Sequence, residues 1–533
     1  MHPLPSRTLR QLKRARLLTI CVACVCLACF GSSRPLVPRD ESRAAPGLAP
    51  DAKIDPAVKS AIDSGKTVPV ILLGHDQLLE RLHGLERFER AHDDDNRLQL
   101  RPRVVAELKA IAAREQRDIL RLLGKPSAER SLWIANAMVL TLTPDEVRRA
   151  ATLADVEFIY PSIEQFAEQE PVGKLSLVLP RERRQPFSTT GKRIAWNVER
   201  LGAPRVWTEL GNRGEGAVIG ILDGGANYGH PDLRGNVWRN AREIPGNGVD
   251  DDRNGYIDDY YGYDIATGHA EVRDTTPQRQ HGTWTSGIVA GDGTNGIITG
   301  VAPRASLMLL IAGGPIENGL AYQYAIENGA DVMSMSFSIP NLGNLRGLWR
   351  MMSDHALAAG LVLVGGAGNF QQSAKVPAQV QTPKDIPSVI AVGGVDTASA
   401  LVFFSSLGPV EWGSVALYGD FPMPAGLLKP DVVAYPGPNY PVLAAGDSGY
   451  IDPNPKIQGN SFSGPQGAGV AALILSANPS LAAWRVKRIL EETARDLESP
   501  GRDVRTGSGL IDAFAAVQRA RALAGVSAGR EWD

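Results

Sequence analysis

Cysteine is scarce in this chain of 533 residues, and all four cysteines lie within one short apolar run, residues 17–30. If that run is removed, no cysteine remains, which excludes disulfide bonds and thiol catalysis. Charge of either sign is not in excess, since the formal net charge is −2, so nucleic acid is not an expected partner. With 43% apolar and 21% charged residues, the composition is that of a globular protein too long for one domain.

A membrane-spanning run is also missing, because the apolar segment LLTICVACVCLACF (Leu17–Phe30) is shorter than the roughly 20 residues that a span needs. Basic residues precede it and Gly31-Ser32-Ser33 follows, an arrangement typical of an export signal. We predict a signal peptide at residues 1–30 and a secreted, extracellular or periplasmic protein. An N-terminal anchor helix is one alternative. The ending at Cys29 weakly resembles a lipoprotein cleavage site, so a lipid anchor at Cys29 is another, and no other membrane partner is expected.

The first half of the chain divides by composition. Residues 31–65 are rich in Pro, Ala, Ser and charge and are predicted to be a linker. Residues 66–162 alternate strand-like and helical patterns, with the capped helix start Thr143-Pro144-Asp145-Glu146, and predict a small α+β domain. Residues 163–195 lose this periodicity and expose a basic cluster at 181–184, which indicates a second linker and a processing region.

A different pattern begins at Trp196, where short apolar runs alternate with helical segments. The apolar runs are Ala217–Leu222, Ser306–Ala312, Val332–Phe337, Leu361–Ala367 and Ser388–Val395. Strands that are apolar on both faces and separated by helices indicate an α/β fold with a parallel sheet covered on both sides. In such a sheet the chemistry gathers at the carboxyl ends of the strands.

Four polar residues occupy such junctions between strand and helix. Asp223 follows the first apolar run, His281 opens a helix of small residues, Asn369 follows LVLVGGAG, and Ser461 precedes the helix GAGVAALILSA. Taken alone, each has an ordinary explanation as a turn or cap residue. Together they provide an acid, an imidazole, an amide donor and a hydroxyl. Such a set activates a serine nucleophile and stabilises an oxyanion.

Several motifs around these residues resemble the subtilisin-like serine proteases, the subtilase or peptidase S8 family. They are WNVERLGAPRVW (residues 196–207), GVAP (300–303), KPDVVA (429–434) and GSGLIDAFAAV (507–517). The chain order Asp, His, Ser is also that of the subtilisins. The resemblance implies a three-layer αβα sandwich with a mostly parallel sheet over residues 196–522 and a tail at 523–533. It also implies that residues 66–162 form an inhibitor I9-like propeptide domain.

The resemblance assigns a catalytic role to each of the four polar residues. His281 would take the proton of the Ser461 hydroxyl, and Asp223 would orient the imidazole and stabilise its charged form. Asn369 would bind the oxyanion together with the backbone N–H of Ser461.

By the same resemblance, two segments would bind an extended protein or peptide substrate. The first pairs with the substrate backbone and consists of Ser336, Phe337 and Ser338. The second forms the facing wall of the pocket for the residue before the cleaved bond, and includes Gly366 and Gly368. Phe370 and the lack of an obvious acid nearby favour an uncharged, apolar substrate residue there, with packing of Phe370 into the core as the alternative.

The most acidic stretch of the chain is GNGVDDDRNGYIDDYYGYD, residues 246–264. Oxygen ligands stand at the spacing of a calcium loop in Asp250, Asp252, Asn254 and Asp258. The twelfth position is Tyr261 instead of a bidentate glutamate, so the match is partial, and a solvated acidic loop is the alternative. Related proteases use calcium for stability, which implies a structural and not a catalytic ion.

Two regions depart from the family pattern. Gly224 replaces the serine or threonine that usually follows the catalytic acid, and the nucleophile segment reads GNSFSGPQGAG instead of GTSMAxPHVAG. Neither change removes a proton-transfer group. We therefore predict an exported serine endopeptidase, made as a self-processing zymogen that binds its own propeptide. The alternatives are a catalytically weakened binding protein of the same fold, and an exopeptidase.

Overall fold

The computed structural model describes residue 36 and residues 48–162, 186–274, 280–437, 439–446, 448–451 and 457–527. The chain divides into two compact units, Met1–Ala44 and Ala45–Asp533. The predicted signal peptide, Cys29 and most of the predicted processing region lie outside the described residues. In the part of the chain that is described, no helix is both long and apolar enough to cross a bilayer.

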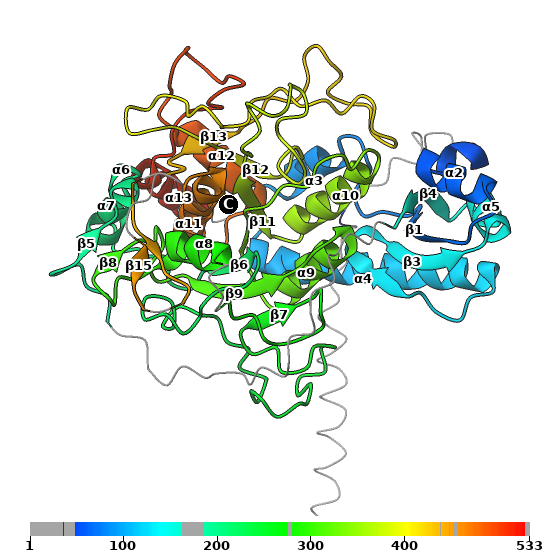
Figure 1. Ribbon diagram of the computed structural model, residues 1–533, viewed down its shortest axis with the longest axis horizontal. Helices are drawn as coiled ribbons and strands as arrows, with labels where there is room; N and C mark the ends of the chain where they lie inside the picture. The colour runs from blue at the N-terminus through cyan, green and yellow to red at the C-terminus, as the bar shows by residue number, and fades with distance from the viewer. Residues whose placement is uncertain are drawn as a thin grey trace, which may run out of the picture. The chain divides into compact units, whose positions relative to one another are not determined.

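A seven-stranded parallel sheet forms the centre of the chain from residue 193 onward (Figure 1). Its order is β13-β12-β11-β10-β6-β9-β7, and every pairing within it is parallel. The strands are β6 (Val218–Leu222), β7 (Gly262–Asp264), β9 (Ser306–Ile311), β10 (Val332–Met335), β11 (Val362–Gly366), β12 (Ile390–Gly394) and β13 (Val432–Ala434). The predicted α/β fold with a parallel sheet is confirmed, although no predicted run marked β7 or β13.

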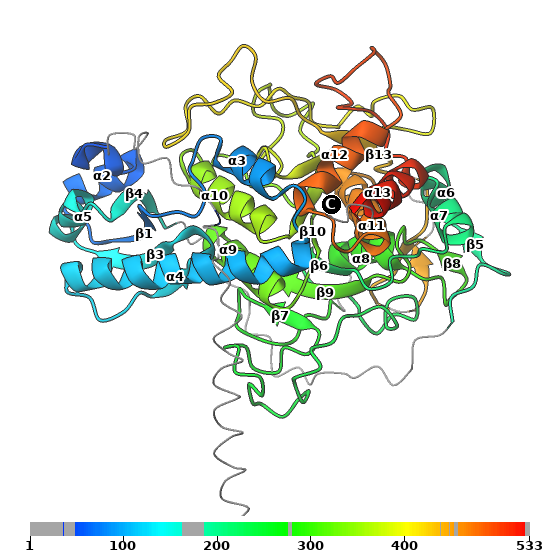
Figure 2. The ribbon, with the colours of Figure 1, turned by 180° about the vertical axis from the view of Figure 1, so that it is seen from behind.

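Helices cover both faces of this sheet. In Figures 1 and 2, α8 (His281–Ala290) and α11 (Asn460–Ala477) lie on one side of the strands, and α9 (Pro315–Glu327) and α10 (Leu345–Ala358) on the other. The other described elements of this part are the helices α6 (Trp196–Arg200), α7 (Ala203–Glu209), α12 (Ala483–Thr493) and α13 (Ala513–Ser527), and the paired short strands β5 (Arg193–Ile194) with β8 (Ile297–Ile298) and β14 (Val442–Leu443) with β15 (Tyr450–Ile451).

Close packing of α11 on β11 fixes the position of the helix start that carries Ser461. Gly464 lies so near the sheet that a Cβ atom there would be 2.5 Å from the backbone N of Gly366. A side chain at 464 would therefore push the helix away from the strand. The unusual glycine in GNSFSGPQGAG thus brings Ser461 close to the carboxyl end of β11.

Residues 50–161 form a smaller α+β unit with an antiparallel sheet of order β2-β3-β1-β4. Its elements are η2 (Pro50–Lys53), α2 (Pro56–Asp63), β1 (Val68–Gly74), α3 (Gly84–His92), α4 (Arg97–Leu123), β2 (Arg130–Leu132), η3 (Trp133–Ala135), β3 (Ala137–Leu142), α5 (Pro144–Thr152) and β4 (Val156–Pro161). Thr143 caps α5 in a capping box with Glu146, as the sequence pattern predicts.

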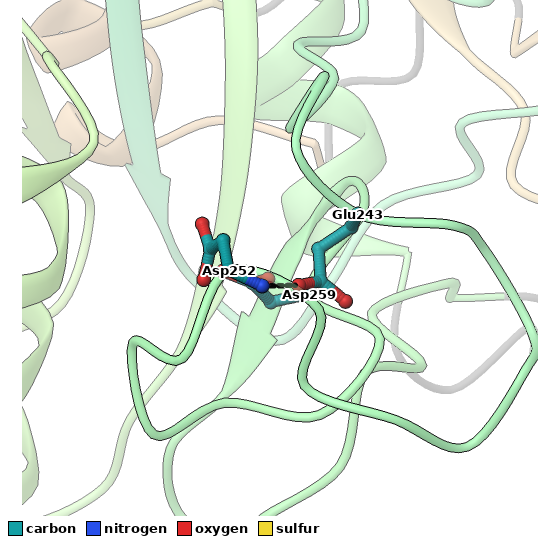
Figure 3. A group of neighbouring side chains, drawn as sticks. All are labelled: Glu243, Asp252 and Asp259. Carbon is teal, nitrogen blue, oxygen red and sulfur yellow. Dashed lines mark hydrogen bonds between the residues drawn. The ribbon is translucent and has the colours of Figure 1, made fainter. Parts of the chain in front are cut away.

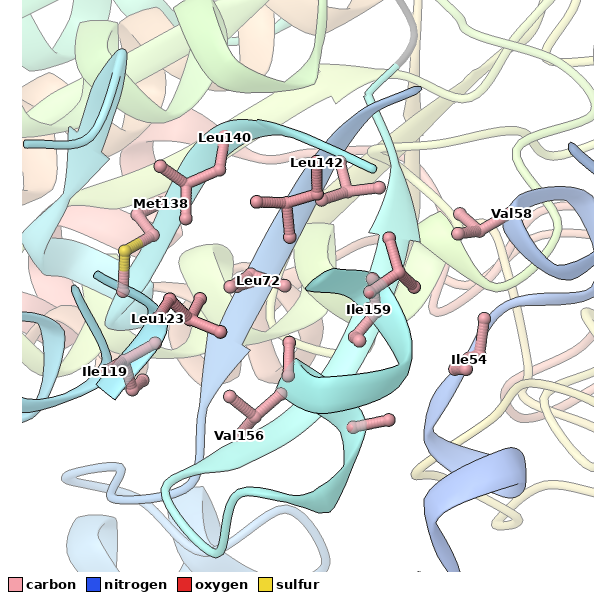
Figure 4. Close-up of a cluster of buried hydrophobic side chains, with 14 of the residues drawn as sticks. Ile54, Val58, Leu72, Ile119, Leu123, Met138, Leu140, Leu142, Val156 and Ile159 are labelled. Atoms are coloured by element: carbon pink, nitrogen blue, oxygen red, sulfur yellow. The ribbon is translucent and has the colours of Figure 1, made fainter. Parts of the chain in front are cut away.

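The N-terminal boundary of this smaller unit differs from the predicted one. Residues 50–63 were expected to belong to the 31–65 linker, but they form η2 and α2. Ile54, Val58 and Ile62 pack in the same buried cluster as Leu72 and Ile159 (Figure 4). The prolines that suggested a linker stand at the first turns of these helices, where proline is well tolerated.

Candidate active site

Asp223 and His281 form a hydrogen-bonded pair at the carboxyl edge of the large sheet. Asp223 directly follows β6, and His281 is the first residue of α8. The Nδ1 atom of His281 lies 2.8 Å from Oδ2 and 2.9 Å from Oδ1 of Asp223. Gly282 allows this approach, because a Cβ atom at that position would clash with the backbone carbonyl of Gly225.

The Asp223 carboxylate sets the proton affinity of His281. Burial disfavours the imidazolium, but the charge and the hydrogen bond of Asp223 outweigh it and raise the pKa of His281 above 6.5. The carboxylate holds the Nδ1 proton, so Nε2 of the neutral ring is left as the acceptor. In this arrangement the His281 ring binds a proton more tightly than a free imidazole does.

Thr285 supplies a hydrogen bond that the sequence reasoning missed. Its hydroxyl lies one helical turn after His281 and donates to Oδ2 of Asp223 at 3.1 Å, while the backbone N–H of Gly224 donates to Oδ1 at 2.8 Å. Gly224 stands where the family pattern has a residue with a hydroxyl group. Thr285 of α8 provides a hydroxyl to Asp223 instead. Residue 285 lies on the same face of α8 as residue 281, a spacing of four that could have drawn attention to it.

Ser461 lies in the first turn of α11 and is hydrogen-bonded to Ser336. Its hydroxyl donates to the backbone carbonyl of Ser336 at 3.2 Å, and the Ser336 hydroxyl donates to the carbonyl of Ser461 at 2.9 Å. Among the described residues, no hydrogen bond joins Ser461 to His281. The next residue, Phe462, places its ring centroid 6.3 Å from that of His281, so the first turn of α11 lies beside the first turn of α8. Rotation about the Cα–Cβ bond would redirect the hydroxyl.

Asn369 approaches the same helix start from the end of β11. Its Oδ1 accepts a hydrogen bond from the backbone N–H of Asn460 at 2.7 Å. This bond orients the amide, so that the Nδ2 donor is the group left for a ligand. The N-terminal end of the α11 dipole adds a field that favours negative charge.

Two atypical residues of the nucleophile segment tie it to its surroundings. Asn460 is fully buried and donates from Nδ2 to the carbonyl of Gly368 at 2.7 Å and to Oγ of Ser405 at 3.0 Å. Gln466 is also fully buried, and its Nε2 donates to the carbonyl of Phe462 at 2.8 Å and to the carbonyl of Tyr435. Both side chains therefore hold the turn around Ser461 in place.

The residues of the predicted substrate-binding segments lie beside the start of α11, which carries Ser461. Ser336, Phe337 and Ser338 follow β10, and Gly366 ends β11, with Gly368 just beyond it. The structure therefore brings these segments to the carboxyl ends of two neighbouring strands, which pair in parallel with Met335 opposite Gly365.

The acidic side chains of residues 246–264 make two kinds of contact: some accept hydrogen bonds from backbone N–H groups of the loop, and others belong to a carboxylate cluster. Asp258 accepts hydrogen bonds from the backbone N–H groups of Gly246, Asn247 and Gly248, and Asp250 accepts from those of Asn254 and Gly255. Of the four predicted ligands, only Asp252 belongs to the carboxylate cluster described next. Asn254 lies beside that cluster, because its Nδ2 donates to Asp259 at 3.0 Å.

Glu243, Asp252 and Asp259 form this cluster, with one oxygen of each within 4.8 Å of the others (Figure 3). Burial raises the pKa of Asp259 to about 6 and also raises the pKa of Glu243. Oε2 of Glu243 is buried and has no hydrogen-bond partner among the described residues. Three carboxylates and an unpaired buried oxygen fit a hard divalent cation such as calcium. Glu243 was missed because it precedes the acidic stretch.

The comparison with protein families places this geometry in a known class. The model of the subtilase family, peptidase S8, matches residues 214–509, which is more than half of the chain. The chain belongs to the subtilase family.

Individual relatives agree with this assignment. The chain is 28% identical to bacillopeptidase F of Bacillus subtilis over 449 residues, 79% of this chain and 29% of the relative. It is 27% identical to subtilisin-like protease 1 of Plasmodium berghei over 58% of this chain and 51% of the relative. It is 30% identical to subtilisin DY of Bacillus licheniformis over 61% of this chain and 99% of the relative. The chain thus spans about half or less of the first two relatives and nearly all of the third.

Proposed function

We propose that the protein is an exported serine endopeptidase that hydrolyses peptide bonds with Asp223, His281 and Ser461. The observation that carries this proposal is the Asp223–His281 pair beside the helix start of Ser461, in a chain of the subtilase family. The predicted signal peptide supports export. A weakened binding protein of the same fold is disfavoured, because Thr285 donates a hydrogen bond to Asp223, and the atypical Asn460 and Gln466 hydrogen-bond the turn that carries Ser461 to its surroundings.

The proposed mechanism begins with attack of the Ser461 hydroxyl oxygen on the carbonyl carbon of the scissile bond. Nε2 of His281 takes the hydroxyl proton, and Asp223 stabilises the resulting imidazolium. Asn369 Nδ2 and the backbone N–H of Ser461 donate to the oxyanion of the tetrahedral intermediate. His281 then returns the proton to the leaving amine, and an acyl-enzyme ester remains on Ser461. Water, activated by His281, hydrolyses this ester and restores the free serine.

The smaller unit is proposed to be an inhibitor I9-like propeptide, removed by self-cleavage within residues 163–195. We expect the wild-type precursor to be cleaved there and the Ser461→Ala variant to remain intact. Ser463→Ala is the matched control, because Ser463 is fully buried and its hydroxyl donates to Oδ1 of Asn460 in the same turn at 3.2 Å. N-terminal sequencing of the purified chains measures the outcome. Cleavage in the Ser461→Ala variant at the wild-type rate would contradict the proposal.

We further propose that Glu243, Asp252 and Asp259 bind a structural calcium ion, as subtilases commonly bind calcium. A ligand present at a hundred times its Kd stabilises the folded state by about 2.7 kcal/mol. We therefore expect calcium to raise Tm by several degrees in the Ser461→Ala background, and Glu243→Gln to remove most of this increase. Asp251→Asn is the control, because Asp251 is exposed. An equal Tm in calcium and in chelator would contradict the site.

A further inference from the structure

Lys384 is a fully buried lysine that has no salt bridge to a carboxylate in the part of the chain that the structure describes. Among the described residues, its ammonium makes one hydrogen bond, to Oγ of Ser338 at 2.9 Å, and has no carboxylate within 4.0 Å. The ring of Phe337 lies 5.5 Å from the same nitrogen and offers a cation–π contact. An ammonium group has three donors, so most of its hydrogen-bonding capacity is unused.

A second buried lysine shows how this chain normally stabilises such a charge. Lys429 is equally buried, and its ammonium donates to Asp431 at 2.7 Å and to the carbonyl of Val389 at 2.6 Å. The acid next to Lys384 is directed elsewhere, because Asp385 accepts from Arg346 at 2.7 Å and from Thr382 at 3.0 Å. Burial consequently lowers the pKa of Lys384 to about 7.

The position of Lys384 connects it to the segments that bind substrate in the proposed function. Ser336 is hydrogen-bonded to Ser461, and Ser338 is two residues further along, at most about 7 Å away along an extended chain. The backbone of Ile339 pairs with that of Thr382, so the segment carrying Lys384 runs beside residues 336–339.

The facing segment borders Lys384 from the other side. A Cβ atom on Gly365 would lie 2.8 Å from Cδ of Lys384, so glycine at this position leaves room for the lysine stem. Gly365 is followed by Gly366, whose added Cβ would clash with the backbone of Asn460. The lysine thus ends between the two predicted substrate-binding segments, on the Ser338 side.

We propose that Lys384, together with the Ser338 hydroxyl, selects substrates that carry aspartate or glutamate immediately before the cleaved bond. This proposal rests on the proposed peptidase function and names its substrate class. A substrate carboxylate would accept hydrogen bonds from the Ser338 hydroxyl and the ammonium and would supply the missing counter-charge. A buried charge without a counter-charge is energetically unfavourable. An uncharged substrate side chain would leave the Lys384 ammonium in that state in the complex. The proposal replaces the sequence-based interpretation of an apolar pocket.

The test compares peptides that differ only in the residue before the cleaved bond, namely Glu, Gln or Leu. For the wild-type enzyme we expect kcat/KM for Glu to exceed that for Gln by about 10- to 100-fold, because a buried donor rejects a substrate that leaves it unpaired. In Lys384→Met the Glu-to-Gln ratio should fall to about one and the Leu peptide should gain. Lys375→Met is the control, since Lys375 is exposed, and should keep the wild-type ratio.

Each outcome decides the proposal. A wild-type preference for Leu over Glu, or an unchanged Glu-to-Gln ratio in Lys384→Met, overturns the role of Lys384. If Lys384→Met does not fold, the wild-type ratio of Glu to Gln alone decides. A fluorophosphonate probe distinguishes failure of the proposed substrate class from failure of the peptidase function. If Ser461 is labelled and the enzyme prefers an apolar residue before the cleaved bond, only the substrate class is overturned. Absence of both labelling and cleavage overturns the peptidase function as well.

Discussion

Replacement of His281 by alanine is expected to lower kcat for peptide hydrolysis by about six orders of magnitude. His281 is the only group in the proposed site that takes the proton of Ser461, and its pairing with Asp223 at 2.8 Å presents the other ring nitrogen to the reaction. Without it the serine stays protonated and is a poor nucleophile. Steady-state kinetics on a peptide with a fluorescent leaving group would measure the loss.

The Asp223→Asn variant tests the Asp223–His281 pair through the pH dependence of kcat/KM. Asparagine keeps the shape but not the charge, and a loss of about four orders of magnitude in kcat is expected. The pKa of His281 is raised by Asp223, so the wild-type kcat/KM should fall as pH drops through a value above 6.5, where the base becomes protonated. In Asp223→Asn burial alone remains and lowers the pKa, so this acid limb should move to lower pH. An unmoved acid limb would mean that Asp223 does not control His281.

A buried ion pair between Arg97 of α4 and Asp331 is expected to contribute strongly to the free energy of unfolding. Nη1 of Arg97 lies 2.7 Å from Asp331, with the two side chains 3% and 10% exposed. The same guanidinium donates to the backbone carbonyls of Gly360 and Pro479. Asp331 in turn accepts from the N–H of Val218, the first residue of β6, which leads to Asp223. One side chain from the smaller unit thus supports the start of a central strand.

Arg97→Ala is therefore expected to destabilise the precursor by about 3–5 kcal/mol, because it leaves the Asp331 carboxylate buried and unpaired. The midpoint of denaturant unfolding would be measured in the Ser461→Ala background, where self-cleavage is absent. Arg121→Ala is the control on the same helix, since its pair with Asp118 is exposed and worth less than about 1 kcal/mol. Equal midpoints for both variants would show that the Arg97–Asp331 pair does not stabilise the precursor.

Much of the fold could be predicted from local patterns. Five of the seven strands of the large sheet were marked by nearly continuous apolar runs, because a strand buried on both faces has few polar residues in its sequence. The junction residues Asp223, His281 and Asn369 could be placed for the same reason, since each stands where such a run ends or a helix begins. β13 is only three residues long and β7 lies at the end of the acidic stretch, so neither produced a clear signal.

The contacts that the sequence could not reveal are those between residues far apart in the chain. Thr285 replaces a hydroxyl lost at Gly224, and Glu243 joins the acidic stretch from outside it. Lys384 stands in TPKDIP, a composition typical of an exposed turn, yet it is fully buried. Its burial depends on the packing of Ser338 and Gly365, which come from two other segments. Tertiary packing, and not local composition, decides such positions.

The central claim is that Ser461 is an activated nucleophile. Its most direct test is to identify the residue at which a fluorophosphonate probe reacts with the purified protein. An activated serine attacks phosphorus and expels fluoride, which leaves a covalent adduct on its oxygen, whereas an ordinary serine hydroxyl does not react. Peptide mapping by mass spectrometry should find this adduct on Ser461, and both Ser461→Ala and His281→Ala should abolish it. Labelling of a different serine, or no labelling of folded and processed wild-type protein, would contradict the account.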